Sequence, residues 1–310
     1  MTKSFCLFAA LLFPAMSFAQ SAGYTFLRTP VGARQAAMAA SFISISKDAH
    51  SIYYNPAGLA DMSNRAATFG YINNILDVQD FFGAYVMPHK QGSYGFALQY
   101  TDYGEFKRTN EFGEELGNFG ANNVIAYLNY SRAHSERLLV GGNLKYIRSA
   151  LADFSSDAFA LDLGVIYHSS LFDNFDFGAG VFNLGRVRKT FDGLKEDLPL
   201  NYQFGISKRL AHLPLLYSLT LVAYPDPGKV VQFEEVQFRA GGEFNLSQNA
   251  YLRLGYNTLG RDQKVGTDSD RFAGLSIGLG LDYRQYKFDY GMSSFGEIGN
   301  LNRLSMSIIF

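Results

Sequence analysis

Ser276 is the residue whose setting most resembles a catalytic nucleophile. The stretch Gly274 to Gly278, GLSIG, has the G-x-S-x-G spacing of a nucleophile elbow, which needs a sharp turn from a strand into a helix. The surrounding apolar residues instead continue a period-two strand, with small or polar residues between Leu275, Ile277, Leu279 and Leu281. We therefore interpret Ser276 as a small residue on the inner face of a strand.

The histidines and the single cysteine offer no other reactive centre. The pair His168 and Ser169 is explained by hydrogen bonding within a turn, and the histidines show no metal-ligand spacing: His50, His89, His134, His168 and His212. Cys6 lies in a segment that we expect to be removed, so disulfides and thiolate sites are excluded. We predict no catalytic residue, no metal and no cofactor, and hence a protein that is not an enzyme.

The N-terminus predicts export. Residues 1–19 combine a basic start at Lys3, an apolar run and the small residues before Gln20, which is typical of a cleaved signal peptide. The run is too short for a transmembrane anchor. A net charge of −1 gives no basic excess for a nucleic-acid partner.

The rest of the chain is dominated by period-two alternation, which predicts strands with one apolar and one small or polar face. We expect about fourteen strands, at 65–72, 79–87, 93–101, 121–132, 137–148, 157–168, 174–185, 200–209, 214–224, 232–245, 250–257, 271–283, 285–292 and 302–310. A soluble sandwich would show the same alternation. The connections distinguish the two, because long polar loops (102–120, 149–156, 186–199, 258–270, 293–301) alternate with short turns (133–136, 210–213, 246–249, near Arg284).

This alternation of loop lengths is typical of a transmembrane antiparallel β-barrel. We assign residues 65–310 to an outer-membrane barrel of a Gram-negative bacterium, surrounded by outer-membrane lipid. The chain ends in RLSMSIIF, whose terminal aromatic residue, Phe310, resembles a barrel-assembly signal.

Residues 20–64 are predicted to form a short helical hatch, or plug. Val31 to Ala40 is compatible with a helix, and Phe42 to Ser46 is expected to be briefly extended. Asp48 can cap a short helix from Ala49 to Tyr54 that ends at Asn55-Pro56, and Gly58 permits a tight turn.

The hatch carries a family resemblance. Ala33-Arg34, the small residues Ala36 to Ala40, Asp48-Ala49 and YYNPAGLA (Tyr53 to Ala60) resemble the N-terminal signature of the PorV/PorQ family, itself similar to FadL-type barrels. Three other stretches extend the resemblance along the mature chain: Gly23 to Arg34, Gln99 to Phe106 and Leu198 to Thr220. The last two of these look closer to the PorQ branch. The hatch motif is then Arg34, Asp48, Asn55, Pro56, Ala57 and Gly58.

The resemblance implies a docking, anchoring or shuttle component of the type IX protein secretion system. Its partners would be PorZ-like or sortase-like surface proteins, or cargo. Residues that combine aromatic and charged side chains in the long loops are the expected docking residues: Tyr103, Phe106, Phe112, Phe119, Arg186, Arg188 and Lys189. The alternative is a FadL-like transporter of long-chain fatty acids or other hydrophobic small molecules.

Charges on the small-residue faces of the strands argue for a closed lumen. If the apolar faces meet lipid, these charges point inward and must find partners or water: Lys145, Asp162, Asp176, Arg239, Glu243, Arg253, Asp282, Lys287 and Asp289. We therefore expect an ion-paired lumen wall packed against the hatch, with Arg34, Asp48 and Asn55 tying the hatch to the wall.

Overall fold

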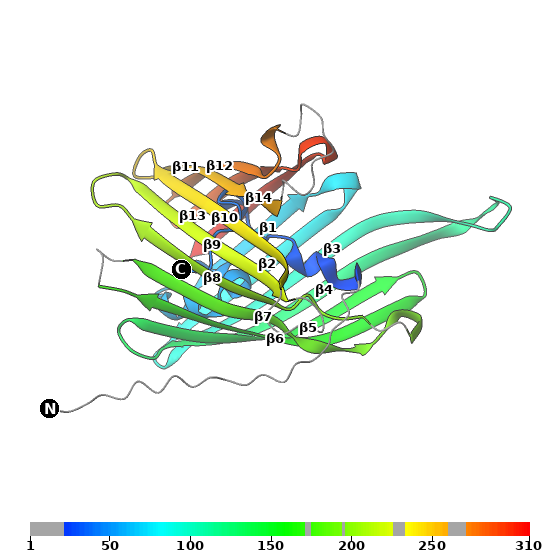
Figure 1. The fold of residues 1–310 in the computed structure, drawn as a ribbon, viewed down its shortest axis with the longest axis horizontal. Helices are drawn as coiled ribbons and strands as arrows, with labels where there is room; N and C mark the ends of the chain where they lie inside the picture. Colours follow the sequence, from blue (N-terminus) through cyan, green and yellow to red (C-terminus); the bar gives the residue numbers. More distant parts are fainter. Residues whose placement is uncertain (1–21, 171–174, 194–195, 226–232, 260–270) are drawn as a thin grey trace.

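The computed structural model describes residues 22–170, 175–193, 196–225, 233–259 and 271–310. The predicted signal peptide, residues 1–19, lies outside these ranges. Within them, the chain forms a closed antiparallel barrel of fourteen strands in which β1 pairs with β14 (Figure 1). The strands are β1 (Ala66–Asn73), β2 (Gln79–His89), β3 (Gly92–Thr109), β4 (Glu115–Ala133), β5 (Leu138–Leu151), β6 (Phe154–His168), β7 (Asp176–Lys189), β8 (Asn201–Arg209), β9 (Leu215–Pro225), β10 (Phe233–Asn245), β11 (Ala250–Asn257), β12 (Leu275–Tyr283), β13 (Tyr286–Ser294) and β14 (Asn300–Ile309).

The period-two alternation separates the outer face from the lumen, as predicted. Along β6, Leu161, Leu163 and Val165 are exposed on the outside, whereas Ala160 and Asp162 are buried. The same division holds along β12, where Leu275 to Leu281 point outward at every second position. A continuous apolar outer surface of this kind is unfavourable in water and typical of a barrel in lipid. Among the described helices, none is long and apolar enough to cross a membrane.

The connections differ from the prediction at one end of the barrel. Residues 102–120 were predicted as a loop, but β3 and β4 continue through most of them and leave only residues 110–114 as the turn. Likewise, β5 and β6 are joined at residues 152–153, and β7 continues to Lys189. The ends of β3 and β4 extend beyond the rest of the barrel, where their residues are exposed on both faces. They therefore lack the alternation of apolar and polar residues that predicts a strand. The short turns at the opposite end agree with the prediction.

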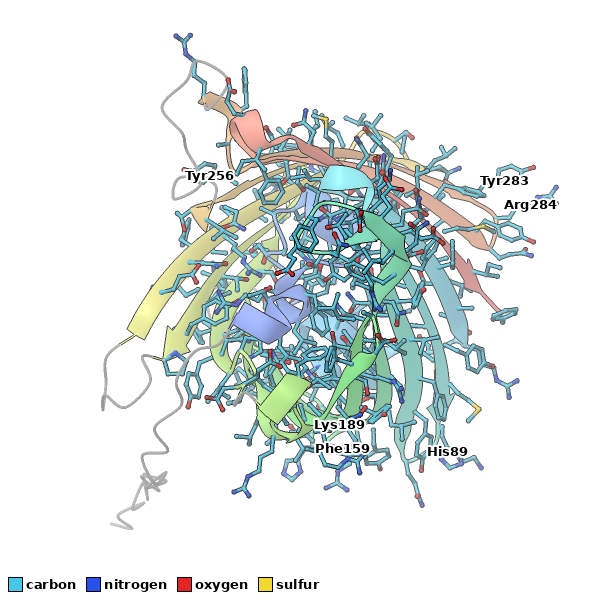
Figure 2. All side chains as sticks on the ribbon, turned by 90° about the vertical axis from the view of Figure 1, so that its right-hand side faces the viewer. His89, Phe159, Lys189, Tyr256, Tyr283 and Arg284 are labelled. Carbon is cyan, nitrogen blue, oxygen red and sulfur yellow. The ribbon has the colours of Figure 1, made fainter. Side chains whose placement is uncertain are left out.

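The hatch comprises four short helical segments: η1 (Ala22–Arg28), α1 (Ala33–Ala37), α2 (Ser51–Tyr54) and η2 (Pro56–Asp61). It lies inside the ring of strands (Figure 2), and nearly all of its residues from Val31 to Leu59 are buried. The helices are shorter than expected, and Phe42 to Ser46 forms a turn instead of an extended segment. Other 3-10 turns in the described connections include η3 (Ile75–Asp77), η4 (Phe191–Gly193) and η6 (Gly296–Ile298).

Candidate functional site

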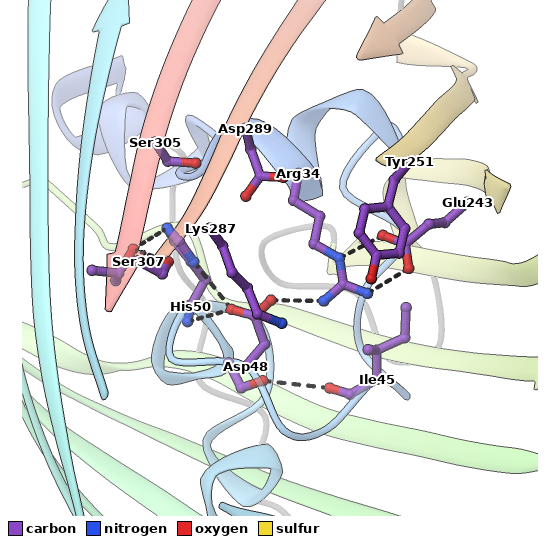
Figure 3. A network of polar contacts seen from close by, with 12 residues as sticks. Arg34, Ile45, Asp48, His50, Glu243, Tyr251, Lys287, Asp289, Ser305 and Ser307 are labelled. Carbon is purple, nitrogen blue, oxygen red and sulfur yellow. Dashed lines mark hydrogen bonds and ion pairs between the residues drawn. The ribbon is translucent and has the colours of Figure 1, made fainter. Parts of the chain in front are cut away.

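The contact between hatch and wall centres on Arg34 (Figure 3). Its guanidinium donates to both carboxylate oxygens of Glu243 on β10, at 2.7 and 2.9 Å, and to Asp48 of the hatch at 2.8 Å. Glu243 also accepts from Arg253 Nε at 2.8 Å, and Arg253 Nη1 lies 2.6 Å from Asp289 on β13. Two guanidinium groups and three carboxylates thus form one buried, bidentate network. It ties the hatch to β10, β11 and β13.

The same network continues to the neighbouring strands β14 and β1 through Asp48 and His50. Asp48 Oδ1 accepts from the backbone N–H of His50 at 2.9 Å and lies 3.1 Å from His50 Nδ1. The other ring nitrogen of His50 lies 3.3 Å from Thr68 Oγ1 on β1, which accepts from Ser307 on β14 at 2.9 Å. The imidazole also stacks on Phe82. Asp48 therefore reaches the wall only through Arg34 and His50.

The hatch charges stay ionised despite their burial. Burial alone would raise the pKa of Asp48, but hydrogen bonds from His50 and the charge of Arg34 outweigh it and hold that pKa well below its usual range. Burial likewise opposes the charge on Arg34, and the carboxylates of Glu243 and Asp48 overcome it and raise the pKa of Arg34. Removing any one member would leave a buried charge with fewer partners.

Asn55, Pro56, Ala57 and Gly58 form a second attachment. Asn55 ends α2 in an extended conformation, as expected before proline, and its side-chain oxygen accepts from the N–H of Ala57 to cap η2. Its amide donates to Ile43 O at 2.6 Å and to Val165 O on β6 at 3.0 Å. Gly58 lies in the 3-10 turn η2 without a left-handed backbone, and a Cβ atom there would meet Ser51 Oγ at 2.7 Å.

A third group of polar residues lines β4 to β7 beside α2. Lys145 Nζ lies 2.6 Å from Asp162, which also accepts from the Asn143 side chain at 3.0 Å. Asn143 donates to Ile52 O of the hatch at 2.7 Å, and Asn129 donates to Asn143 at 2.8 Å. Five of the nine predicted inward charges are buried: Lys145, Asp162, Arg239, Glu243 and Arg253. The other four are only half-buried: Asp176, Asp282, Lys287 and Asp289.

A belt of wall glycines lets the hatch backbone approach the strands. At nine described positions, a Cβ atom would lie within 2.7 Å of a hatch atom: Gly95, Gly141, Gly164, Gly178, Gly205, Gly241, Gly255, Gly278 and Gly291. The tightest is Gly164, where a Cβ would meet Asn55 Oδ1 at 2.0 Å. The high glycine content of the sequence is thus partly a requirement for space around the hatch.

His168 fastens the end of the hatch, a role that the sequence did not suggest. Its Nδ1 lies 2.6 Å from Asp176 on β7, and its Nε2 lies 3.1 Å from Asp61 at the end of η2. Because both ring nitrogens face carboxylates, this geometry suits the doubly protonated imidazolium. The hydrogen bond from His168 in turn lowers the pKa of Asp61, with partial burial opposing it. Only the pairing of β6 with β7 brings these groups together.

The two cavities described beside the hatch are small. One cavity of about 30 Å³ lies between η1 and the wall, with Tyr53, Tyr127, Phe182 and Tyr224 among its lining residues. Another of about 40 Å³ lies beside α1 and β12 to β14. Each holds only a few water-sized groups. In the described ranges, no cluster of histidine, cysteine and acidic residues could hold a metal ion.

The predicted docking residues divide between the lumen and the surface. Tyr103 on β3 faces inward and accepts from Asn123. Phe106 on β3 stacks on Phe119 of β4, and Phe112 at the hairpin tip is 80% exposed. Arg186, Arg188 and Lys189 lie on β7, where Arg188 pairs with Asp157 and Lys189 donates to Ser155. Of the seven predicted docking residues, only Phe112 lies in a loop. The prediction that the other six lie in loops was wrong, because β3, β4 and β7 extend further than the sequence indicated.

Two other sequence features have clear structural positions. Phe310 is 67% exposed, and its N–H donates to Arg65 O beside β1. Ser276 lies in the lumen on β12 and donates to Ser293 on β13, with no strand-to-helix turn beside it. The strand interpretation of GLSIG is confirmed.

Comparison with solved structures identifies the class of fold. The chain is similar to a Pseudomonas aeruginosa FadL homologue (TM-score 0.54, 10% identity, covering 90% of this chain and 98% of that one). It is also similar to the Pseudomonas putida toluene transporter TodX (0.55, 11%, 96% and 98%) and to the CymD monoaromatic hydrocarbon channel (0.57, 11%, 90% and 97%). No protein family model and no curated protein matches the chain.

The protein therefore has the FadL-like barrel fold, and the predicted fold class is confirmed. Identities of 10–11% show the fold alone. The PorV/PorQ branch and the secretion partners stay predictions.

Proposed function

We propose that this protein is a non-enzymatic outer-membrane barrel whose hatch gates the passage of a hydrophobic small molecule. One observation carries the proposal: an apolar-faced barrel closed by a hatch inside its lumen, in the fold shared with a toluene transporter and a monoaromatic hydrocarbon channel. The outer-membrane location is supported by the exposed apolar side chains around the wall and by the alternation of loop lengths.

The described state is closed, so passage requires the hatch to move. Cavities of about 30 and 40 Å³ are too small for an aromatic ring or an acyl chain. The hatch is held by hydrogen bonds, ion pairs and packing and by no disulfide, since Cys6 is the only cysteine.

A reversible lock tests this gating. Ser41 of the hatch lies 3.1 Å from Ser218 on β9, measured between hydroxyl oxygens, so the double variant Ser41→Cys/Ser218→Cys can join hatch to wall. Ser276→Cys/Ser293→Cys is the matched control, because those hydroxyls are also 3.1 Å apart but both belong to the wall.

The readout is uptake of radiolabelled toluene, and separately of oleate, by Gram-negative cells that lack their own transporters for these solutes. Oxidation should abolish uptake in the hatch-locked variant, and reduction should restore it, while the control is unaffected. Equal uptake in the oxidised and reduced hatch-locked variant would refute gating. Uptake no faster than in cells without the protein would refute transport.

A second candidate is a docking platform for a secretion complex, as the sequence resemblance implies. The observation that favours it is the β3–β4 hairpin, which extends beyond the other strands (Figure 1). It carries the stacked pair Phe106–Phe119 and the exposed Phe112 and Leu116, which suit an interface anchor.

Deleting residues 104–118 should abolish recovery of surface-protein partners or cargo in a mild-detergent pull-down while the barrel still assembles. Leu246→Ser, which removes an equally exposed leucine at a turn on the opposite end, is the control. Unchanged recovery after the deletion would count against this hairpin. The oxidised hatch lock should not affect recovery, so the two candidate functions are separable.

A further inference from the structure

Arg303 on β14 differs from the buried arginines of the hatch network. Arg34 and Arg253 each contact two carboxylates. Arg303 is only 1% exposed, yet its hydrogen-bond partners are neutral: Nε donates to Pro30 O and Nη1 to Ser293 Oγ, both at 3.2 Å. These bonds use two of the five guanidinium donors. No carboxylate pairs with Arg303 among the described residues.

Arg303 lines the cavity of about 40 Å³ beside α1. The other polar groups in that lining are Asn257, Ser276, Ser293 and Ser294, and the described lining contains no acidic side chain. Asp80 on β2 is aligned with Arg303 across the intervening strand β1. Its carboxylate, however, accepts hydrogen bonds from Thr101 and Asn74. The cavity thus combines one cation with several hydroxyl donors.

The second cavity provides a contrast. Arg239 is also buried there without a carboxylate partner among the described residues, and it donates to Gln237. That cavity, however, is lined by Asp162 as well as by Lys145 and Arg28. A carboxylate therefore already lies among the cations of that cavity, whereas Arg303 is the one charged side chain in the described lining of its own cavity.

The hatch contributes a strained wall to the Arg303 cavity. Ala39 and Ala40, both in its lining, have left-handed backbones with φ of 52° and 59°. This conformation is unfavourable for a residue with a Cβ and persists only where the surroundings hold it. Here, N–H groups of both alanines are bonded to Ala36 O and Gln35 O at 2.9 and 2.8 Å. The backbone is therefore held in a shape that leaves the cavity open.

We propose that this cavity is a binding site for a small anion of carboxylate size. Arg303 would supply the opposite charge, and the hydroxyls of Ser293 and Ser294 would donate further hydrogen bonds, since the hydroxyl of Ser276 already donates to Ser293. A buried guanidinium is unfavourable without a counter-charge, and the anion provides one. The volume suits a formate or acetate group and excludes larger anions. Because the lining comes from both hatch and wall, the bound anion would fasten the hatch to β12–β14.

Formate is the probe, and gluconate, which is too large for the cavity, is the control anion at equal ionic strength. The readout is the rate at which a thiol reagent labels the variant Ser41→Cys. In the parent protein, the Ser41 side chain is fully buried between the hatch and β9. Replacing gluconate by formate should slow labelling at least fivefold, with saturation. Arg303→Met should lose this formate dependence.

Ser294→Leu keeps Arg303 and fills the cavity, so it tests the site if Arg303→Met does not fold. It should label at the same rate in both salts. Equal labelling of the parent in formate and gluconate would overturn the proposal, as would a formate effect that persists in Arg303→Met or in Ser294→Leu. The latter two results would mean that formate acts elsewhere on the protein.

Discussion

Glu243→Gln should loosen the hatch more than any other single-atom change in the lumen. The carboxylate is 2% exposed and accepts three hydrogen bonds, two from Arg34 and one from Arg253. An uncharged amide of the same shape keeps one acceptor oxygen and places an N–H₂ group against a guanidinium. The substitution therefore leaves two buried cations with weaker partners and no change in volume.

The magnitude follows from the remaining contacts. Breaking a buried ion pair by removing one partner costs about 3–5 kcal/mol. Asp48 still faces Arg34 and Asp289 still faces Arg253, so we expect the lower end of this range. About 3 kcal/mol corresponds to roughly a 150-fold larger population of the hatch-open state, at ~1.36 kcal/mol per factor of ten.

Thiol labelling measures this population directly. Ser41 is fully buried between hatch and β9, and Cys6 is the only native cysteine. Where closing is faster than labelling, the rate at Ser41→Cys is proportional to the open fraction. We expect Glu243→Gln to raise this rate about 150-fold while unheated gels still show a folded barrel.

Asp153→Asn is the matched control. It also removes one carboxylate from an arginine, Arg108, but Asp153 is 79% exposed and such pairs contribute little. Its labelling rate should stay within about twofold of the parent, since surface pairs are worth less than ~1 kcal/mol. If Glu243→Gln changed labelling no more than Asp153→Asn, the network would not hold the hatch.

Three further outcomes are expected. Gly164→Ala should destabilise the seated hatch by about 1–3 kcal/mol through overpacking, whereas Gly83→Ala, whose Cβ would meet nothing closer than 3.9 Å, should be near neutral by the same labelling assay. Deleting Phe310 should lower the yield of heat-modifiable barrel in outer membranes; an unchanged yield would remove its assembly role. The folded pKa of Asp61 is depressed by its hydrogen bond from His168, so its stabilisation is full above the unfolded pKa of about 3.9 and is lost as pH falls through the lower folded value. Pepsin cleavage of the hatch should therefore rise steeply in that acid range for the parent, and Asp61→Asn should flatten the dependence.

The alternation of apolar residues determined the barrel. A strand that separates lipid from lumen must place its side chains on alternating faces, so strand number and inward charges could be predicted from local sequence. The same logic explains where prediction failed. Beyond the wall, β3 and β4 are solvated on both faces, and residues such as Glu105 and Lys107 carry no alternation that distinguishes a hairpin from a loop.

Within the hatch, the sequence determined the local features. Proline after Asn55 ends α2, and the asparagine side chain caps η2, because both effects act within a few residues. The residues of the hatch motif could thus be singled out, although the lengths of its helices could not.

Only the tertiary structure decided which wall residues contact the hatch. Arg34 meets Glu243 from 209 positions away, and His168 joins Asp61 to Asp176 only because β6 and β7 pair beside the end of η2. At nine wall glycines, an added Cβ atom would lie within 2.7 Å of a hatch atom. In the sequence, nothing distinguishes these glycines from the others. Barrel closure and the path of the hatch set these distances, and neither is encoded in the pattern of any single segment.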